Sequence, residues 1–119
     1  MAHCHCRDCQ RLTGTAHSTG AMFAVSDVTL TGRTAEFELE GGSGATVTRT
    51  FCPTCGSPIF GKNTGMRGFI TLSLGTFDDL ESLVPQVAVF ARSKPSWDAM
   101  DPAVESYDTM PDWSPENGT

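Results

Sequence analysis

The sequence predicts a mainly β domain, and three observations support this fold class. Residues 34–40 and 69–74 alternate apolar and polar side chains, which is the period-two pattern of a strand with one buried face. The glycine-rich residues 41–44 follow the first of these stretches, where a hairpin end is expected. A chain of 119 residues suits one ordinary domain with one core, burying somewhat under about 70% of its unfolded surface.

The remaining elements follow in order along the chain. Strands are expected at residues 21–25, 28–30, 34–40, 45–51, 59–60, 69–74 and 87–91. Residues 10–13 predict one helical turn that Gly14 ends, because the stretch is short and glycine favours the conformation of a helix end. A second short turn is expected within residues 76–83, and loop is expected from residue 98 onward. Three phenylalanines are expected in the core: Phe51, Phe60 and Phe69.

All five cysteines lie in two short windows, with Cys4, Cys6 and Cys9 in the first and Cys52 and Cys55 in the second. In an extended segment side chains alternate, so Cys4 and Cys6 point to the same side. A turn at Arg7 and Asp8 then brings Cys9 to the same ion, at a sulfur–zinc distance of about 2.3 Å. Three thiolates on one Zn²⁺ leave a fourth position free for water or a substrate sulfur, as in a catalytic zinc site.

The second window supplies only two ligands. Cys52 and Cys55 are separated by two residues and followed by Gly56, as in half of a zinc knuckle, where glycine takes the turn conformation. Two ligands do not complete a tetrahedral site, so a zinc site, an empty dithiol and a disulfide all stay open for this pair. For the chain as a whole, an odd number of cysteines at ligand spacing fits thiolates on a metal better than disulfides.

The histidines are expected to play secondary roles. His3 and His5 alternate with the first two cysteines, so they point to the opposite side, and packing or hydrogen bonding is expected of them rather than ligation. His17 follows the first window by a short loop. Two interpretations of His17 stay open. It is either a functional group, as a spare metal ligand or an acid–base catalyst, or an ordinary surface histidine.

The net charge of the chain limits the classes of partner that are expected to bind it. The formal net charge is −6, and the acidic residues are concentrated in the second half, where a solvated face is expected. Such a surface repels phosphate backbones and anionic lipids, so nucleic acid and membranes are not expected partners. No apolar run approaches the roughly 20 residues that cross a bilayer, and no secretory leader begins the sequence. A cytoplasmic location is therefore expected.

Four motifs in succession carry a resemblance to a known family. They lie at residues 2–14 (AHCHCRDCQRLTG), 51–58 (FCPTCGSP), 75–79 (GTFDD) and 93–97 (SKPSW). Their order resembles the glutathione-dependent formaldehyde-activating enzyme family, also called the Gfa or centromere protein V family. The resemblance extends to about Tyr107, and four ordered motifs are more specific than one Cys-x-x-Cys pair. A zinc-binding domain over residues 1–107 and an acidic, proline-containing tail over residues 108–119 are therefore expected.

The resemblance implies an Mss4-like fold of twisted antiparallel sheets with zinc-binding loops. It also implies that Cys4, Cys6 and Cys9 hold a catalytic zinc. Cys52 and Cys55 match ligands of a structural zinc, which the family completes with a Cys-x-Cys pair on an N-terminal strand. Because that strand is absent from this sequence, we expect a merged site or an empty pair, and a homo-oligomer that covers the sheet edge left uncovered.

The implied reaction is the condensation of formaldehyde with the thiol of glutathione to S-hydroxymethylglutathione, or the reverse cleavage by a carbon–sulfur lyase. Zinc would bind the incoming sulfur as a thiolate and so raise the fraction of nucleophile. No side chain is assigned a catalytic role beyond the zinc ligands. Substrate contacts are expected from Arg7, Arg11, His17, Lys94 and Trp97. Two alternatives stay open: a non-enzymatic zinc module that binds a protein partner, and a truncated, inactive family member.

Overall fold

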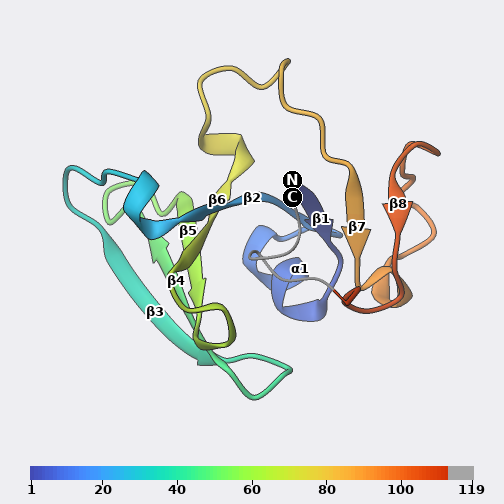
Figure 1. Cartoon of the computed structure of the whole chain (residues 1–119), viewed down its shortest axis with the longest axis horizontal. Helices are drawn as coiled ribbons and strands as arrows, with labels where there is room; N and C mark the ends of the chain where they lie inside the picture. Colours follow the sequence, from blue (N-terminus) through green and yellow to red (C-terminus); the bar gives the residue numbers. More distant parts are fainter. Residues whose placement is uncertain (113–119) are drawn as a thin grey trace.

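The computed structural model describes residues 1–112, which form one open sheet of eight strands and a single short α-helix (Figure 1). The strands are β1 Ala2–Cys4, β2 Ser18–Ala24, β3 Ala35–Glu40, β4 Thr46–Phe51, β5 Pro58–Asn63, β6 Phe69–Ser73, β7 Val87–Val89 and β8 Glu105–Ser106. The helix is α1 Arg7–Thr13, and the 3₁₀ turns are η1 Val25–Asp27, η2 Thr64–Met66, η3 Leu74–Thr76 and η4 Ala91–Ser93. No helix in this part of the chain has the length and apolar character needed to cross a membrane.

The strand order is β3-β4-β5-β6-β2-β1-β7-β8, and most of the sheet is built from hairpins. β3 pairs with β4 over its whole length, and the glycine-rich residues 41–44 connect the two strands. β4 pairs with β5 with a shift in register between Thr50 and Phe51, just before the second cysteine window. β6 then joins β2, where a Cβ on Gly20 would lie 2.6 Å from Cγ2 of Thr71. This close approach of the two strands requires glycine.

The N-terminal strand lies inside the sheet. β1 pairs antiparallel with β2 and parallel with β7, so that Cys4 stands opposite Ser18 on one side and Val89 on the other. The amide of His5 continues this pairing and donates to the carbonyl of Val89 at 3.0 Å. Within the described residues, β3 and β8 are the two edges of the sheet. The first cysteine window therefore begins at an interior position, and the expected homo-oligomer stays a prediction.

The mainly β fold class is confirmed, and most of the predicted strands are present with shifted ends. Five strand pairs are antiparallel, as expected, and the two pairs that involve β7 are parallel, so the sheet is mixed. The predicted strand at residues 28–30 is wrong, because no neighbouring strand pairs with it. Helix α1 begins at Arg7, three residues earlier than predicted, since Cys6 caps its first turn. Its predicted end at Gly14 is confirmed by a left-handed backbone (φ 72°).

Two predictions in the second half of the chain have mixed outcomes. The short turn expected within residues 76–83 is present at residues 80–83, where the amide of Leu83 donates to the carbonyl of Leu80 at 3.1 Å. It does not extend into a helix: η3 ends at Thr76, and the carboxylate of Asp79 accepts bonds from the amide of Glu81 and the hydroxyl of Ser82. These local bonds compete with helical hydrogen bonding. The segment expected to be loop contains β8, which pairs with β7. The part of that segment over residues 113–119 lies outside the described residues.

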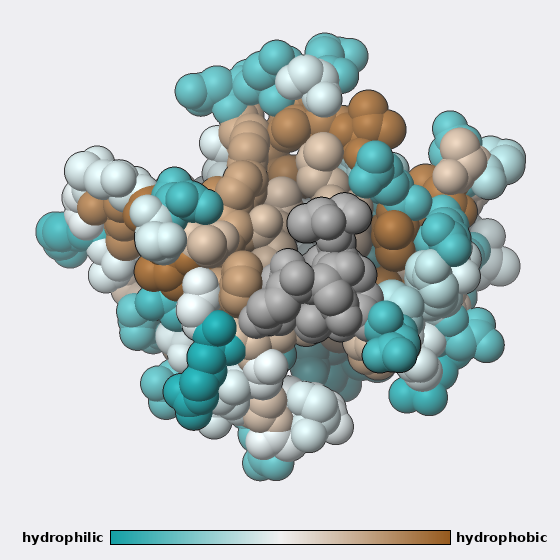
Figure 2. All heavy atoms as spheres, viewed as in Figure 1, coloured by the Kyte–Doolittle hydropathy of each residue, from teal (hydrophilic) through white to brown (hydrophobic). Residues whose placement is uncertain are grey.

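The buried core is small. Its hydrophobic members are Ala16, Ala21, Phe60, Ile70, Leu74, Ala88 and Val89. Of the three phenylalanines predicted in the core, Phe60 is buried, whereas Phe51 and Phe69 are only half-buried. Large apolar side chains such as Phe37 and Trp97 are exposed, and Figure 2 shows apolar residues (brown) interspersed with polar ones on the face in view. Because the core is small, hydrophobic burial stabilises the fold only modestly, and a bound metal would add substantially to its stability.

Candidate metal centre and adjoining cavity

Three cysteine side chains meet where β1 ends and α1 begins. Cys4 is the last residue of β1, Cys6 is the N-cap of α1 with an extended backbone (φ −60°, ψ 155°), and Cys9 lies in the first turn of the helix. Their sulfur atoms all lie within 4.8 Å of one another. In a tetrahedral zinc site, thiolates at a zinc–sulfur distance of about 2.3 Å stand about 3.8 Å apart. The cluster could therefore hold a metal ion after a small contraction.

Hydrogen bonds couple the thiols of this cluster. Bonds from Cys4 and Cys9 lower the pKa of the Cys6 thiol, and the backbone amide of Cys9 adds a bond to the same sulfur at 3.4 Å. The pKa of the Cys4 thiol is raised, because its bonds to Cys6 and Cys9 retain its proton. The cluster by itself thus favours negative charge on Cys6. A divalent cation would let the other thiols ionise as well, since it offsets their mutual repulsion.

Side-chain hydrogen bonds fix helix α1 against the rest of the protein. Nε2 of the buried Gln10 donates to the backbone carbonyls of His5 at 2.9 Å and of Ser93 at 3.0 Å. From β4, the guanidinium of Arg49 donates to the backbone carbonyl of Asp8 at 3.0 Å. Because these bonds hold both the start and the middle of the helix, they also hold two of the three cysteines in place.

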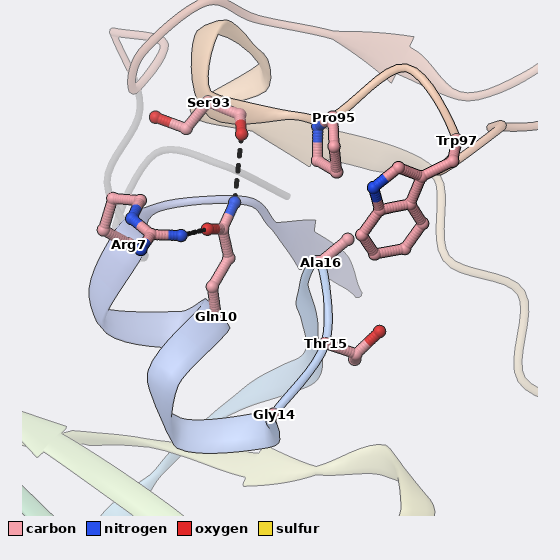
Figure 3. Close-up of a pocket in the computed structure, with 8 residues that line it drawn as sticks. All are labelled: Arg7, Gln10, Gly14, Thr15, Ala16, Ser93, Pro95 and Trp97. Atoms are coloured by element: carbon pink, nitrogen blue, oxygen red, sulfur yellow. Dashed lines mark hydrogen bonds between the residues drawn. The ribbon is translucent and has the colours of Figure 1, made fainter.

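A cavity of about 450 Å³ lies beside α1 (Figure 3). It is lined by Arg7, Gln10, Gly14, Thr15, Ala16, Ser93, Pro95 and Trp97. The guanidinium of Arg7 donates to Oε1 of Gln10, and the indole of Trp97, a residue that is 70% exposed, forms part of the wall. This volume suits a small-molecule ligand. No cysteine lines the cavity, so the thiol cluster and the cavity share helix α1 but not a common wall.

The predicted substrate contacts fall in different places. Arg7 and Trp97 line the cavity. Arg11 is exposed on α1, and its nearest acidic partner lies three residues earlier at 3.7 Å. Nζ of Lys94 donates to a backbone carbonyl four residues later at 3.0 Å. The structure therefore places two of the five predicted contacts on the cavity wall, and Lys94 and His17 both contact Asp98 instead. The role of all five in binding substrate stays a prediction.

The histidines form a second cluster, separate from the thiols. Nδ1 of His17 lies 2.8 Å from Oδ2 of Asp98, and Nδ1 of His5 lies 3.3 Å from the same oxygen. His3 belongs to the same cluster, because its ring packs edge-on against that of His17 with a centroid distance of 4.7 Å. Burial, and then the neighbouring His17 and His5, lower the pKa of His3. His17 therefore lies with Asp98 and the other histidines and not with the three thiols, and its role as a spare ligand or acid–base group stays a prediction.

Comparison with known proteins places the chain in a family. A family model described as glutathione-dependent formaldehyde-activating enzyme matches residues 1–93, which is more than half of the 119 residues. The chain belongs to this family. Within the glutathione-dependent formaldehyde-activating enzyme family, glutathione-dependent activation of formaldehyde is the suggested activity. No curated protein gives a significant match to the chain.

In this family member, the matched residues contain both cysteine windows, and the second forms a knuckle after β4. The amide of Gly56 (φ 78°) donates to the carbonyl of Cys52 at 2.8 Å, and the exposed Sγ of Cys55 lies 3.1 Å from Oγ of Ser57. Amide hydrogen bonds from Cys55 and Thr54 lower the pKa of the Cys52 thiol. All five cysteines are free thiols, and no third metal ligand gathers with this pair in residues 1–112.

Sequence reasoning gave no site role to two residues of this family member, Gln10 and Asp98. Gln10 lies inside the first motif, but its partners His5 and Ser93 are identified only by the folded structure. Asp98 directly follows the fourth motif and was expected in a solvated acidic face, although its side chain is only 13% exposed. It is separated from His17 by 81 residues, so no local spacing could relate the two. Asp98 also lies beyond the segment that the family model matches.

Proposed function

We propose that this chain is a zinc-dependent carbon–sulfur lyase that acts on the adduct of a small thiol with an aldehyde, glutathione with formaldehyde. The observation that carries the proposal is the cluster of Cys4, Cys6 and Cys9, whose sulfur atoms lie within 4.8 Å of one another. Three sulfur ligands are the donor set of a zinc site with one position free for a substrate sulfur. Family membership supports a glutathione-type substrate.

The reaction joins the sulfur of glutathione to the carbon of formaldehyde. The thiolate attacks the carbonyl carbon, the carbon–sulfur bond forms, and the former carbonyl oxygen takes up a proton in place of the one the thiol lost. Cleavage of the adduct runs the same steps in reverse. Zinc bound by Cys4, Cys6 and Cys9 would supply stabilisation of the substrate thiolate near neutral pH. The three cysteines therefore act as ligands and not as nucleophiles.

The cavity beside α1 offers contacts for the rest of the glutathione molecule. Arg7 is the one cation among the described residues that line it, and it would pair with a substrate carboxylate. This cation matters because the chain carries a net charge of −6, which repels an anionic substrate. The indole of Trp97 would cover the apolar part of the peptide. Arg7 and Cys9 lie two residues apart on α1, and no cysteine lines the cavity, so a bound glutathione would have to extend from the cavity past the helix to reach the sulfur ligands.

The proposal places the protein in the cytoplasm, where glutathione keeps cysteine side chains reduced. The five free thiols support this location, because zinc ligation and reaction with a substrate thiol both need cysteines that are not oxidised.

Exchange at equilibrium tests the proposal, because formaldehyde and glutathione also combine without a catalyst. The rate at which ¹³C-labelled formaldehyde exchanges between its free and glutathione-bound forms is measured by NMR exchange spectroscopy. We expect the zinc-loaded protein to accelerate this exchange, Cys6→Ser to lose both zinc and acceleration, and the matched variant Cys55→Ser to keep both. An exchange rate that is the same with the zinc-loaded protein as in buffer would exclude the lyase.

A non-enzymatic zinc module is the second candidate, and the composition of the cavity wall favours it. No cysteine lines the cavity, and the wall includes the exposed side chain of Trp97, a residue type enriched at the centres of protein interfaces. Replacement of zinc by Co²⁺ separates the two candidates. In the lyase, added glutathione brings a fourth sulfur to the metal and strengthens the thiolate-to-cobalt charge-transfer band. In a module without substrate, the band does not change.

A further inference from the structure

The three histidines of the chain all lie in one place. The ring centroid of His17 lies 4.7 Å from that of His3 and 5.2 Å from that of His5. Asp98 adds a carboxylate to this group. One donor atom each from His5, His17 and Asp98 lies within 4.8 Å of the other two, and none of these residues belongs to the thiol cluster.

The distances within this group suit a metal ion. Nδ1 of His17 stands 2.8 Å from Oδ2 of Asp98, and Nδ1 of His5 stands 3.3 Å from the same oxygen. Nitrogen and oxygen ligands about 2.1 Å from one ion are separated from each other by about 3.0 to 3.4 Å. The observed separations lie close to this range, so small side-chain shifts would let the three atoms bind one ion.

The charge of Asp98 supports a cation here. Its side chain is 13% exposed, and within residues 1–112 it pairs only with the two histidines His5 and His17. Lys94 directs its ammonium group to the backbone carbonyl of Asp98 and not to the carboxylate. A carboxylate with this little solvent needs a positive partner, because burial of an unpaired charge is costly.

The hydrogen bonding of His5 is incomplete. The ring is fully buried, and Nδ1 faces the backbone carbonyl of Ala16 at 3.2 Å as well as the carboxylate of Asp98. The second ring nitrogen, Nε2, is buried and has no hydrogen-bond partner among the described residues. A neutral imidazole carries one proton and one lone pair, so one of these is left unused inside the protein. Nδ1, which faces both Ala16 and Asp98, is the nitrogen that would bind an ion, and the proton of the neutral ring would then lie on Nε2.

We propose that His5, His17 and Asp98 form a second metal site, which binds a divalent first-row transition metal such as Zn²⁺, Co²⁺ or Fe²⁺. Two imidazoles and one carboxylate suit these ions, whereas three thiolates suit zinc and softer metals. Because His5 lies between Cys4 and Cys6 in the chain, the two sites would share one backbone segment. The site does not depend on the lyase proposal, because that proposal assigns no step to His5, His17 or Asp98.

Cobalt titration tests the second site with a probe that reports its ligands. Metal-free Cys55→Ser protein is the parent, so that the knuckle pair does not compete, and Co²⁺ is added anaerobically with reductant. We expect two equivalents to bind: one with an intense thiolate-to-cobalt charge-transfer band and one with only weak ligand-field bands. Asp98→Asn should weaken the second equivalent by more than about a hundredfold and leave the first intact. Asp78→Asn, an exposed acid-to-amide change, should leave both intact.

A proton NMR measurement keeps the test decisive even where Asp98→Asn does not fold. In the parent loaded with two equivalents of Co²⁺, ligation by histidine produces strongly shifted, solvent-exchangeable signals from the imidazole N–H groups. The His17→Gln variant should lose one of these signals. The second site is refuted by a parent that binds one equivalent only, by a second equivalent that survives Asp98→Asn, or by the absence of shifted imidazole signals.

Discussion

The two cysteine windows have similar spacing but different surroundings. The first lies between an interior strand and helix α1, and its three half-buried cysteines bring their sulfur atoms together. The second lies in the connection between β4 and β5, where Cys55 is exposed and only two thiols are present. Spacing sets the local geometry of each window. The neighbouring elements decide whether a third donor arrives, so the two windows should differ in what they contribute to stability and function.

The largest expected effect is the loss of metal from the first window. In Cys6→Ser, one of three sulfur ligands is removed, and zinc present at 100 to 1,000 times its dissociation constant would have stabilised the fold by about 3 to 4 kcal/mol. The melting temperature should fall by about 10 to 20 °C, together with the zinc content. Differential scanning calorimetry and metal analysis of the purified protein measure both quantities.

The matched change in the second window is Cys55→Ser. It should alter stability by no more than about 0.5 kcal/mol, because Cys55 is exposed and no third ligand gathers with it in residues 1–112. Chelation of the wild-type protein should reproduce the loss seen in Cys6→Ser. Equal losses in the two serine variants would show that the windows are equivalent and would contradict the comparison.

The next effect tests whether the surroundings of the first window matter as much as its spacing. Gln10→Ala removes the donor that the carbonyls of His5 and Ser93 share. The free energy of unfolding should fall by about 2 kcal/mol or more, since two backbone acceptors lose their partner. Zinc affinity should fall as well, because α1 loses a bond that positions it. Competition with a chromophoric chelator measures the affinity, and Arg11→Ala, exposed on the same helix, should leave it unchanged.

A smaller effect separates metal binding from substrate binding at the first window. Arg7→Gln removes the cation from the lining of the cavity and leaves the three sulfur ligands in place. Glutathione should bind about tenfold more weakly. This loss of affinity is at the lower end of the range for removing a charge-assisted hydrogen bond, because Arg7 is exposed to solvent. Zinc content should not change. Calorimetric titration measures the affinity for glutathione. If Arg11→Gln weakens binding equally, Arg7 acts only through its positive charge and not through a specific contact with the substrate.

Local features of the site were predictable from the sequence. Cys4, Cys6 and Cys9 come together because separations of two and three residues span one strand end and one helical turn. The helix end at Gly14 follows from the left-handed conformation that glycine adopts. The hairpin of β3 and β4 follows from alternation and a glycine-rich connection.

Features that depend on distant contacts were not predictable. Asp98 meets His17 across 81 residues, and Gln10 meets Ser93 across 83 residues. The parallel pairing of β1 with β7 likewise joins the two ends of the matched segment. No periodicity within a segment specifies which distant segment it contacts. The burial of Phe51 was overestimated for a similar reason. The length of a strand does not show which of its residues pack against the core.

A further small effect tests the backbone of the second window alone. Gly56 holds a left-handed conformation (φ 78°), and no atom lies within 4 Å of where its Cβ would stand. Gly56→Ala should therefore cost only backbone strain, about 1 kcal/mol, measured from the midpoint of denaturant unfolding. Gly42→Ala is the matched control, because that site is equally open and needs no left-handed backbone. Zinc bound by the first window should be unaffected by either change, whereas its loss in Gly56→Ala would show that the two windows share one metal site.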